Sequence, residues 1–182
     1  MLKASENPPM LFPANCLEES SYGPWWVAHT RSRQEKALAW FLKENEVGYF
    51  LPLRGKVVVH KGRRRKTLLP LFTGYVFFRA GEEARYTALT SNRIAGVIEV
   101  IDQSQLTRQL LRVHQALASG EKMDTHPQLQ RGTRVRVTGG ALMGLEGVIT
   151  RKRGVTKLLL NVDILGQAAA VEIDADLLEL VE

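Results

Sequence analysis

The 182-residue sequence predicts an α+β fold, with an N-terminal domain built on an antiparallel sheet flanked by helices and then a small β-barrel. Helix-type apolar spacing alternates with strand-type segments up to residue 119. A polar stretch containing Pro127 follows over residues 120–130. Beyond it, short β-branched segments are separated by glycines, which is typical of small barrels.

The first strand and first helix are predicted by composition and by spacing. Residues 25–31 are rich in aromatic and β-branched side chains, which favour a strand. Residues 34–46 predict a helix, because Leu38, Phe41 and Leu42 recur at helical spacing with charged residues on the other side.

The middle of the chain predicts a hairpin, further strands and two helices. Extended pieces at 49–53 and 56–61 lead to a basic run placed where a hairpin tip is expected. Residues 74–79, Gly-Tyr-Val-Phe-Phe-Arg, give the strongest strand signal. The elements predicted after it are a short helix at 82–91, a strand at 94–101, and a helix with one buried stripe formed by Leu106, Leu110, Val113 and Leu117.

Four segments follow from this pattern. The predicted domains are a flexible extension at 1–24, an N-terminal domain at 25–119, a linker at 120–130 and a β-barrel at 131–182. The strands predicted in the last segment are 133–138, 147–153, 157–163 and 168–173.

The positive charge is confined to the first part of the chain. The net charge is +6 and the pI is near 9.7, which is typical of a protein with an acidic partner such as nucleic acid, and equally of a solvated basic surface. Residues 1–120 hold 17 Lys and Arg against 10 acids, whereas residues 121–182 hold 8 against 9. We therefore expect the second part to meet its partner by other means.

Several classes of protein are disfavoured. Cys16 is the single cysteine, so no internal disulfide and no thiolate cluster can form. The four histidines show no metal-ligand spacing, no nucleophile motif is present, and the glycines of 139–147 lack the Gly-Lys-Ser/Thr ending of a phosphate loop. No apolar run is long enough for a membrane span or a secretory signal. We expect a cytoplasmic, monomeric protein that is not an enzyme and uses no cofactor or metal.

Segments of the N-terminal part, taken in order, resemble the NusG family of transcription elongation factors. Residues 26–30 with Glu35-Lys36 resemble its opening strand and helix, and residues 61–66 resemble its basic hairpin. Leu-Phe-Thr-Gly-Tyr-Val-Phe at 71–77 resembles the family's Phe-Pro-Gly-Tyr-Val signature, with Thr73 in place of the usual proline. That change could loosen the turn but leaves Phe72 and Tyr75 in place.

The C-terminal part is similar to a KOW domain, a small SH3-like β-barrel. Residues 132–149 resemble the KOW motif, and residues 161–172 resemble the family's closing strands. The likeness spans residues 25–182. The extension, the short linker and the strongly basic hairpin resemble specialised paralogues of the RfaH kind, which favour antitermination at chosen operons.

The resemblance implies two binding functions. An N-terminal NusG domain docks on the clamp helices of RNA polymerase, and a KOW domain recruits the ribosomal protein NusE or the termination factor Rho. The polymerase-binding patch is predicted to be exposed and to comprise His29, Phe72, Tyr75 and Phe77. The alternative is that helices cover both faces of this strand.

Two further surfaces are predicted. DNA or RNA of the elongation complex is expected to contact the backbone-binding cations Arg31, Arg33, Arg63, Arg64, Arg65 and Lys66. The KOW partner is expected to contact Leu142, Met143, Leu145, Ile164 and Leu165, apolar residues near glycine turns that could instead plug the end of the barrel.

Two other functions compete with this interpretation. A ribosome-associated or RNA-binding KOW protein would need a basic barrel, which the near-neutral C-terminal part does not provide. An enzyme would need a catalytic constellation that the motifs do not supply. An RfaH-like protein could fold residues 139–182 as helices, but the glycines in that segment favour strands.

Overall fold

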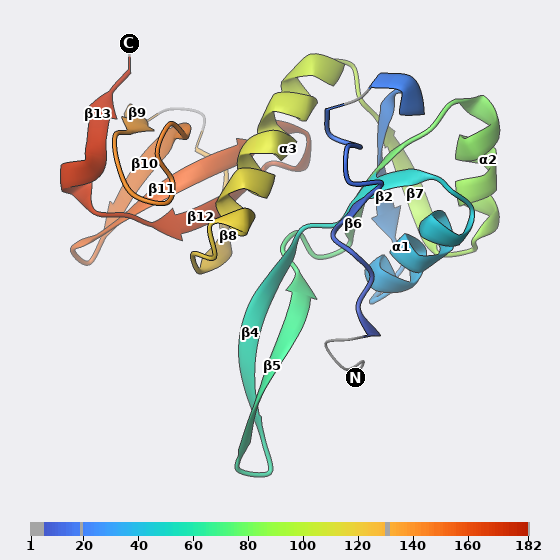
Figure 1. Cartoon of the computed structure of the whole chain (residues 1–182), viewed down its shortest axis with the longest axis horizontal. Helices are drawn as coiled ribbons and strands as arrows, with labels where there is room; N and C mark the ends of the chain where they lie inside the picture. Colours follow the sequence, from blue (N-terminus) through green and yellow to red (C-terminus); the bar gives the residue numbers. More distant parts are fainter. Residues whose placement is uncertain (1–5, 19, 130–131, 182) are drawn as a thin grey trace. The chain divides into compact units, whose positions relative to one another are not determined.

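The computed structural model describes residues 6–18, 20–129 and 132–181. The chain divides into two compact units, Met1–Gln103 and Ser104–Glu182 (Figure 1). The first unit combines helices with sheets, and the second carries a sheet of its own. The predicted α+β class is therefore confirmed. The units divide within a helix, so the predicted domain boundaries at 119–120 and 130–131 stay predictions.

The first unit is built on a five-stranded antiparallel sheet in the order β1-β3-β6-β2-β7. Its strands are β1 (Leu11–Phe12), β2 (Trp25–Thr30), β3 (Gly48–Phe50), β6 (Tyr75–Arg79) and β7 (Ile94–Glu99). Val27 of β2 pairs with Phe77 of β6 and with Ile98 of β7, and the register between β2 and β7 shifts between His29 and Thr30.

One face of this sheet packs against α1 (Glu35–Glu44) and α2 (Glu82–Thr90). The predicted spacing in α1 is confirmed at Leu38 and Leu42, which are buried, while Phe41 is half-buried. They pack with Val76 and Phe78, the two β6 side chains that alternation directs to this face.

The flexible extension predicted for residues 1–24 includes residues 1–5 and 19, which lie outside the described residues, while part of the described segment packs on the sheet. Leu11 and Phe12 pair with β3 as an edge strand, and the Tyr49 hydroxyl donates a 2.9 Å hydrogen bond to the carbonyl of Pro9. Cys16 is fully buried, and a Cβ on Gly48 would lie 2.9 Å from its Sγ. The prolines break regular structure here, but the apolar residues between them still pack on the sheet.

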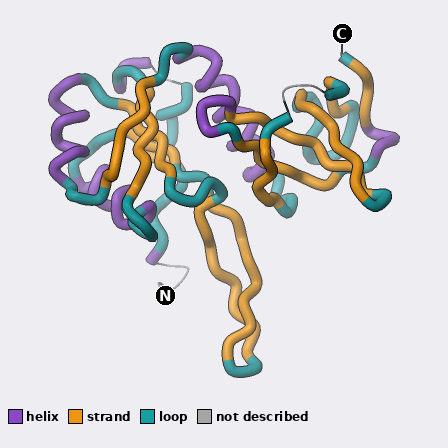
Figure 2. The backbone as a smooth tube through the Cα atoms, turned by 180° about the vertical axis from the view of Figure 1, so that it is seen from behind, coloured by secondary structure: helices purple, strands orange, loops and turns teal. Residues whose placement is uncertain are grey.

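A two-stranded hairpin extends away from the five-stranded sheet (Figures 1 and 2). It consists of β4 (Leu53–His60) and β5 (Arg63–Pro70), joined by Lys61 and Gly62. Both linking residues have positive φ, 48° and 75°, which is the backbone of a two-residue type I′ turn. The predicted hairpin is confirmed, but its tip consists of Lys61 and Gly62, and the basic residues from Arg63 onward lie on strand β5 rather than in the tip.

The second unit contains most of α3 (Gln103–Ala118) and a six-stranded antiparallel sheet in the order β13-β9-β10-β11-β12-β8. The strands are β8 (Met123–Pro127), β9 (Arg134–Val137), β10 (Glu146–Lys152), β11 (Val155–Val162), β12 (Gln167–Glu172) and β13 (Leu178–Leu180). The four predicted strands are present. β8 lies within the predicted linker, where it pairs with β12.

Within the segment 139–182, the described residues 139–181 form strands, short 3-10 helices and turns, as the glycines predict. Gly147 shows why glycine is needed in β10, since a Cβ there would lie 2.5 Å from the carbonyl oxygen of Leu159 on β11. The close approach of these two backbones leaves no room for a Cβ unless the strands move apart.

Candidate interaction surfaces

The four residues of the predicted aromatic patch fall into two groups. His29 is exposed and its ring stacks on half-buried Tyr75, with centroids 5.2 Å apart. Phe72 and Phe77 are buried: they meet edge to face at 6.3 Å, and Phe77 also stacks on Phe50 at 6.5 Å. The prediction of four exposed residues is wrong for these two, because strand alternation fixes a face but does not tell what covers it.

The turn that presents Tyr75 is held firmly. Gly74 has a φ of 85°, and its amide donates a 2.7 Å hydrogen bond to buried Glu35 at the start of α1. Its carbonyl accepts a 2.8 Å bond from Thr30. Thr73 therefore does not loosen this turn. We refer to the surface formed by His29 and Tyr75 as the His29–Tyr75 surface.

The hairpin holds the chain's excess positive charge. Residues 53–70 contain seven Lys and Arg and no acid, whereas the rest of the chain has 18 Lys and Arg against 19 Asp and Glu. An anionic partner of the whole protein is therefore attracted first to the hairpin. Arg31 and Arg33, the other predicted cations, are exposed just after β2.

The predicted basic run is exposed throughout. Because it lies on strand β5, its side chains alternate between the two faces of the hairpin. Arg65 is paired with Val58, and the face they share also carries Arg63 and Lys56; we call it the basic face. The other face places Arg64 opposite Val59, and it also carries Val57 and Lys66; we call it the mixed face. Val57 and Val59 are 54% and 64% exposed.

The five predicted contacts of the C-terminal partner are not equally accessible. Leu142 and Leu145 are buried, in agreement with the alternative that they close the end of the sheet. Met143, between them, is 71% exposed. Ile164 and Leu165 are half-buried in a 3-10 turn after β11.

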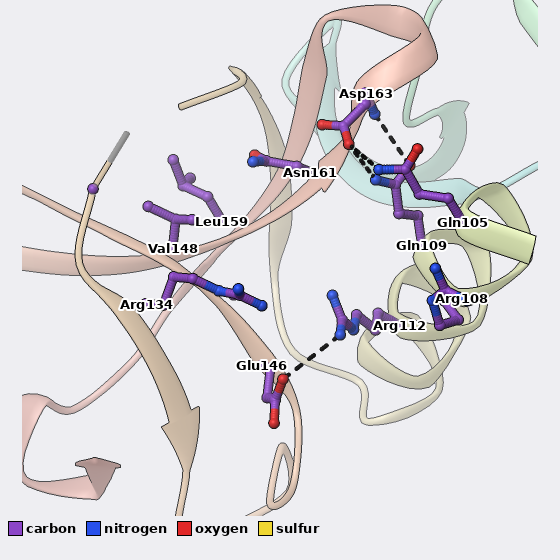
Figure 3. Close-up of a pocket in the computed structure, with 12 residues that line it drawn as sticks. Gln105, Arg108, Gln109, Arg112, Arg134, Glu146, Val148, Leu159, Asn161 and Asp163 are labelled. Carbon is purple, nitrogen blue, oxygen red and sulfur yellow. Dashed lines mark hydrogen bonds and ion pairs between the residues drawn. The ribbon is translucent and has the colours of Figure 1, made fainter. Parts of the chain in front are cut away.

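A polar pocket of about 740 Å³ lies within the second unit, between α3 and the strands β9, β10 and β11 (Figure 3). Arg108 and Arg112 line it from α3, and Arg134 lines it from β9. The sequence analysis missed these arginines. The available signal was the spacing of four between Arg108 and Arg112, which puts them on one helix face.

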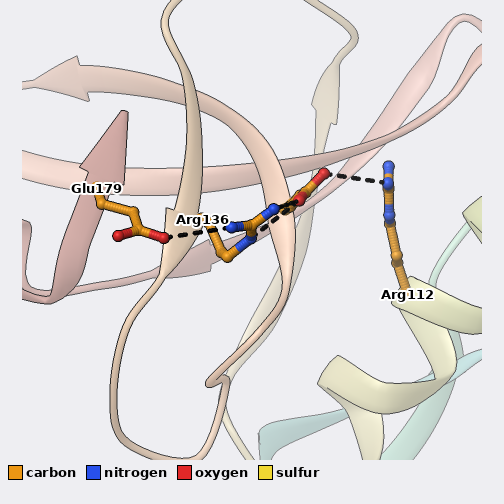
Figure 4. A network of polar contacts seen from close by, with 4 residues as sticks. Arg112, Arg136 and Glu179 are labelled. Carbon is orange, nitrogen blue, oxygen red and sulfur yellow. Dashed lines mark hydrogen bonds and ion pairs between the residues drawn. The ribbon is translucent and has the colours of Figure 1, made fainter. Parts of the chain in front are cut away.

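A charge network borders this pocket (Figure 4). Glu146 Oε1 accepts hydrogen bonds from Arg136 Nε at 3.0 Å and Nη2 at 2.6 Å, and Oε2 lies 3.7 Å from Arg112 Nη2. Arg136 also reaches Glu179 at 3.5 Å. The hydrogen bonds from Arg136 hold the pKa of Glu146 below its ordinary value near 4.5, with smaller contributions from the charges of Arg112 and Arg134.

In residues 6–18, 20–129 and 132–181, no three His, Cys, Asp or Glu side chains group as a metal site would require. Burial raises the pKa of the Cys16 thiol to about 11, against a smaller opposite effect of Arg79, so the thiol stays protonated. Over the same residues, no helix has the length and apolarity to cross a membrane.

The class of protein is given by comparison with known families. Residues 23–119 match a family model described as transcription termination factor nusG. The chain belongs to the NusG family, whose members are transcription factors without catalytic activity. The match covers more than half of the chain, and it includes β2, the hairpin and β6.

Two solved structures are similar to the chain. A structure reported on domain interaction in Thermotoga maritima NusG has a TM-score of 0.48 and 21% identity, covering 87% of this chain and 97% of that one. The MjSpt4:Spt5 complex gives a TM-score of 0.27 and 13% identity, with the same coverage of each chain. A search among curated proteins found no match.

Proposed function

We propose that this protein is a transcription elongation or antitermination factor that binds RNA polymerase through its first unit. The family match over residues 23–119 carries the proposal, because it includes both residues of the His29–Tyr75 surface. Stacked aromatic rings at a surface give a partner helix apolar area at small entropic cost. The clamp helices of the polymerase are the proposed partner, and Phe72 and Phe77 support this surface from beneath.

The hairpin is the proposed contact with nucleic acid. Its strands are eight residues long, so it reaches about 26 Å at the usual rise per residue. Seven cations without an acid suit a phosphate backbone at the upstream edge of the transcription bubble. Arg31 and Arg33 are proposed as a second, weaker contact.

The second unit is proposed to act as a KOW domain that recruits NusE or Rho. Exposed Met143 is the first candidate contact, with Ile164 and Leu165 after it, while Leu142 and Leu145 hold the loop in shape. We place the protein in the cytoplasm as a monomer, where polymerase and ribosome are both accessible. We also propose an RfaH-like specialisation, because the hairpin and the N-terminal extension of this protein resemble those of specialised paralogues.

A single pull-down tests the function. The full chain, immobilised and mixed with core RNA polymerase or with ribosomes, should retain core polymerase directly. Retention of ribosomes alone would favour the competing function, a ribosome-associated KOW protein. Retention of neither would overturn the proposal.

A further inference from the structure

The pocket of the second unit has no role in the proposed function. Its walls lie in α3 and in three neighbouring strands, and all of its lining residues belong to Ser104–Glu182. A volume of about 740 Å³ is within the ordinary range for small-ligand sites, roughly 300–1,000 Å³.

The acidic groups of the pocket are already engaged. Asp163 Oδ2 accepts hydrogen bonds from Gln109 Nε2 at 2.7 Å and from Gln105 Nε2 at 3.0 Å. Glu146 is held by Arg136 and lies beside Arg112. These carboxylates therefore have little capacity left to attract a cation.

Two of the arginines are different. Over the residues that the structure describes, no hydrogen bond or ion pair joins the guanidinium group of Arg108 or Arg134 to another group, although the charge of Arg134 helps to lower the pKa of Glu146. Arg134 and Arg112 point toward one another from opposite walls (Figure 3). Guanidinium groups that converge in this way have the geometry to hold a phosphate.

Asn161 indicates a second property that the ligand of this pocket must have. Its Nδ2 donates a 2.9 Å hydrogen bond to the carbonyl of Leu129, which fixes the orientation of the amide. Its Oδ1 is buried and accepts no hydrogen bond from any described residue. A buried acceptor of this kind is costly unless a donor reaches it. The ligand should therefore carry a hydroxyl or amino group as well as a negative charge.

The remaining wall is apolar. Val148 and Leu159 are directly paired across β10 and β11, and both line the pocket. Arg134 is paired with Val148 on the other side, so cationic and apolar groups follow one another along one row of the sheet. Such a row suits a ligand with a phosphate beside a flat or weakly polar ring.

We propose that this pocket binds one nucleotide of single-stranded RNA. The phosphate contacts Arg108, Arg112 and Arg134, and the ribose 2′-hydroxyl donates to Asn161 Oδ1. The sugar or base lies against Val148. The 2′-hydroxyl is the group that distinguishes RNA from DNA at such a site. The nucleotide chemistry follows from the pocket alone, whereas the choice of an RNA chain over a free nucleotide rests on the proposed function.

The test uses the full chain and three probes: a ribotetranucleotide, the deoxyribotetranucleotide of the same sequence, and AMP. Fluorescence anisotropy should show the ribotetranucleotide binding more tightly than the deoxy form. The double variant Arg108→Gln/Arg134→Gln should weaken it about tenfold and lower its salt slope by up to about 0.7, the contribution of the one phosphate that these arginines hold on a single strand. Arg151→Gln is the matched control, an exposed arginine of β10 outside this pocket, and should change neither value.

Asn161→Leu tests the hydroxyl contact, because it keeps the size of the side chain and removes the acceptor. It should bring the ribo and deoxy affinities together. Because it also removes the Nδ2 hydrogen bond to the Leu129 carbonyl, thermal unfolding is measured beside the affinities to show that the variant is folded. Equal wild-type affinity for the two oligonucleotides, an equal loss in Arg151→Gln, or binding of AMP but not of the ribotetranucleotide would overturn the proposal. Retention of core polymerase without any RNA binding would leave the proposed function standing and refute the pocket alone.

Discussion

Neutralising the hairpin one face at a time tests how it meets nucleic acid. Arg63→Gln/Arg65→Gln removes two cations from the basic face, and Arg64→Gln/Lys66→Gln removes two from the mixed face. All four side chains are exposed, so both variants should fold. The charge change is the same, and only the face differs.

The expected magnitude follows from counterion release. Each phosphate neutralised on duplex DNA contributes about 0.9 to the slope of log affinity against log salt concentration. If the basic face lies along the backbone, its double variant should lower the slope by about 1.8. The mixed face turns Val57 and Val59 outward, which disfavours a hydrated phosphate surface, so its double variant should change the slope by less than about 0.5.

The assay measures the affinity of the full chain for a forked DNA scaffold at about five salt concentrations between roughly 50 and 300 mM. Equal losses of slope in both variants would show that the two faces are equivalent, as in a ribbon inserted into a groove, and would refute this reasoning. No loss in either would mean that the hairpin is merely solvated.

Three further predictions concern stability and packing. The Cys16 thiol is buried and its pKa is raised to about 11, so at pH 8 it should react with a thiol reagent only as fast as the protein unfolds. Rapid labelling of the native chain would contradict the packing of residues 9–18 on the sheet. The lowered pKa of Glu146 means that its ionised side chain stabilises the fold fully above the unfolded pKa near 4.5, and that this stabilisation is lost as the pH falls through the lower folded pKa. Glu146→Gln should therefore be less stable than wild type at pH 7 in chemical denaturation. A stability difference that did not shrink below pH 4.5 would refute the role of Arg136. Gly147→Ala should destabilise the chain by about 2 kcal/mol, since a Cβ there meets the Leu159 carbonyl, and an unchanged unfolding midpoint would be inconsistent with that approach.

Local signals in the sequence were sufficient for the elements themselves. The spacing of Leu38 and Leu42 predicts α1, and the alternation of Val76 and Phe78 predicts which side chains share the α1 face. The hairpin was predicted as well, but its tip was misplaced. Lys61 and Gly62 carry the turn, and a glycine before a run of strand residues is the signal that could have located it.

Features that depend on distant partners were beyond the sequence. Nothing local to Phe77 shows that Phe50 and Phe72 enclose it, and nothing in the proline-rich start shows that Cys16 packs over Gly48. The arginine pocket is of the same kind. It exists only because α3, which ends at Ala118, lies against strands of which the first, β9, begins at Arg134.

The affinity of the full chain for core RNA polymerase, compared between Tyr75→Ala and Tyr86→Ala, tests the central claim most directly. Both changes truncate a surface tyrosine, but Tyr75 stacks on His29 whereas Tyr86 lies 71% exposed on α2. Loss of a central aromatic contact costs about 2 kcal/mol or more, so Tyr75→Ala should weaken binding roughly 30-fold while Tyr86→Ala stays close to wild type. Equal affinities of the folded variants would contradict the claim that the His29–Tyr75 surface binds the polymerase.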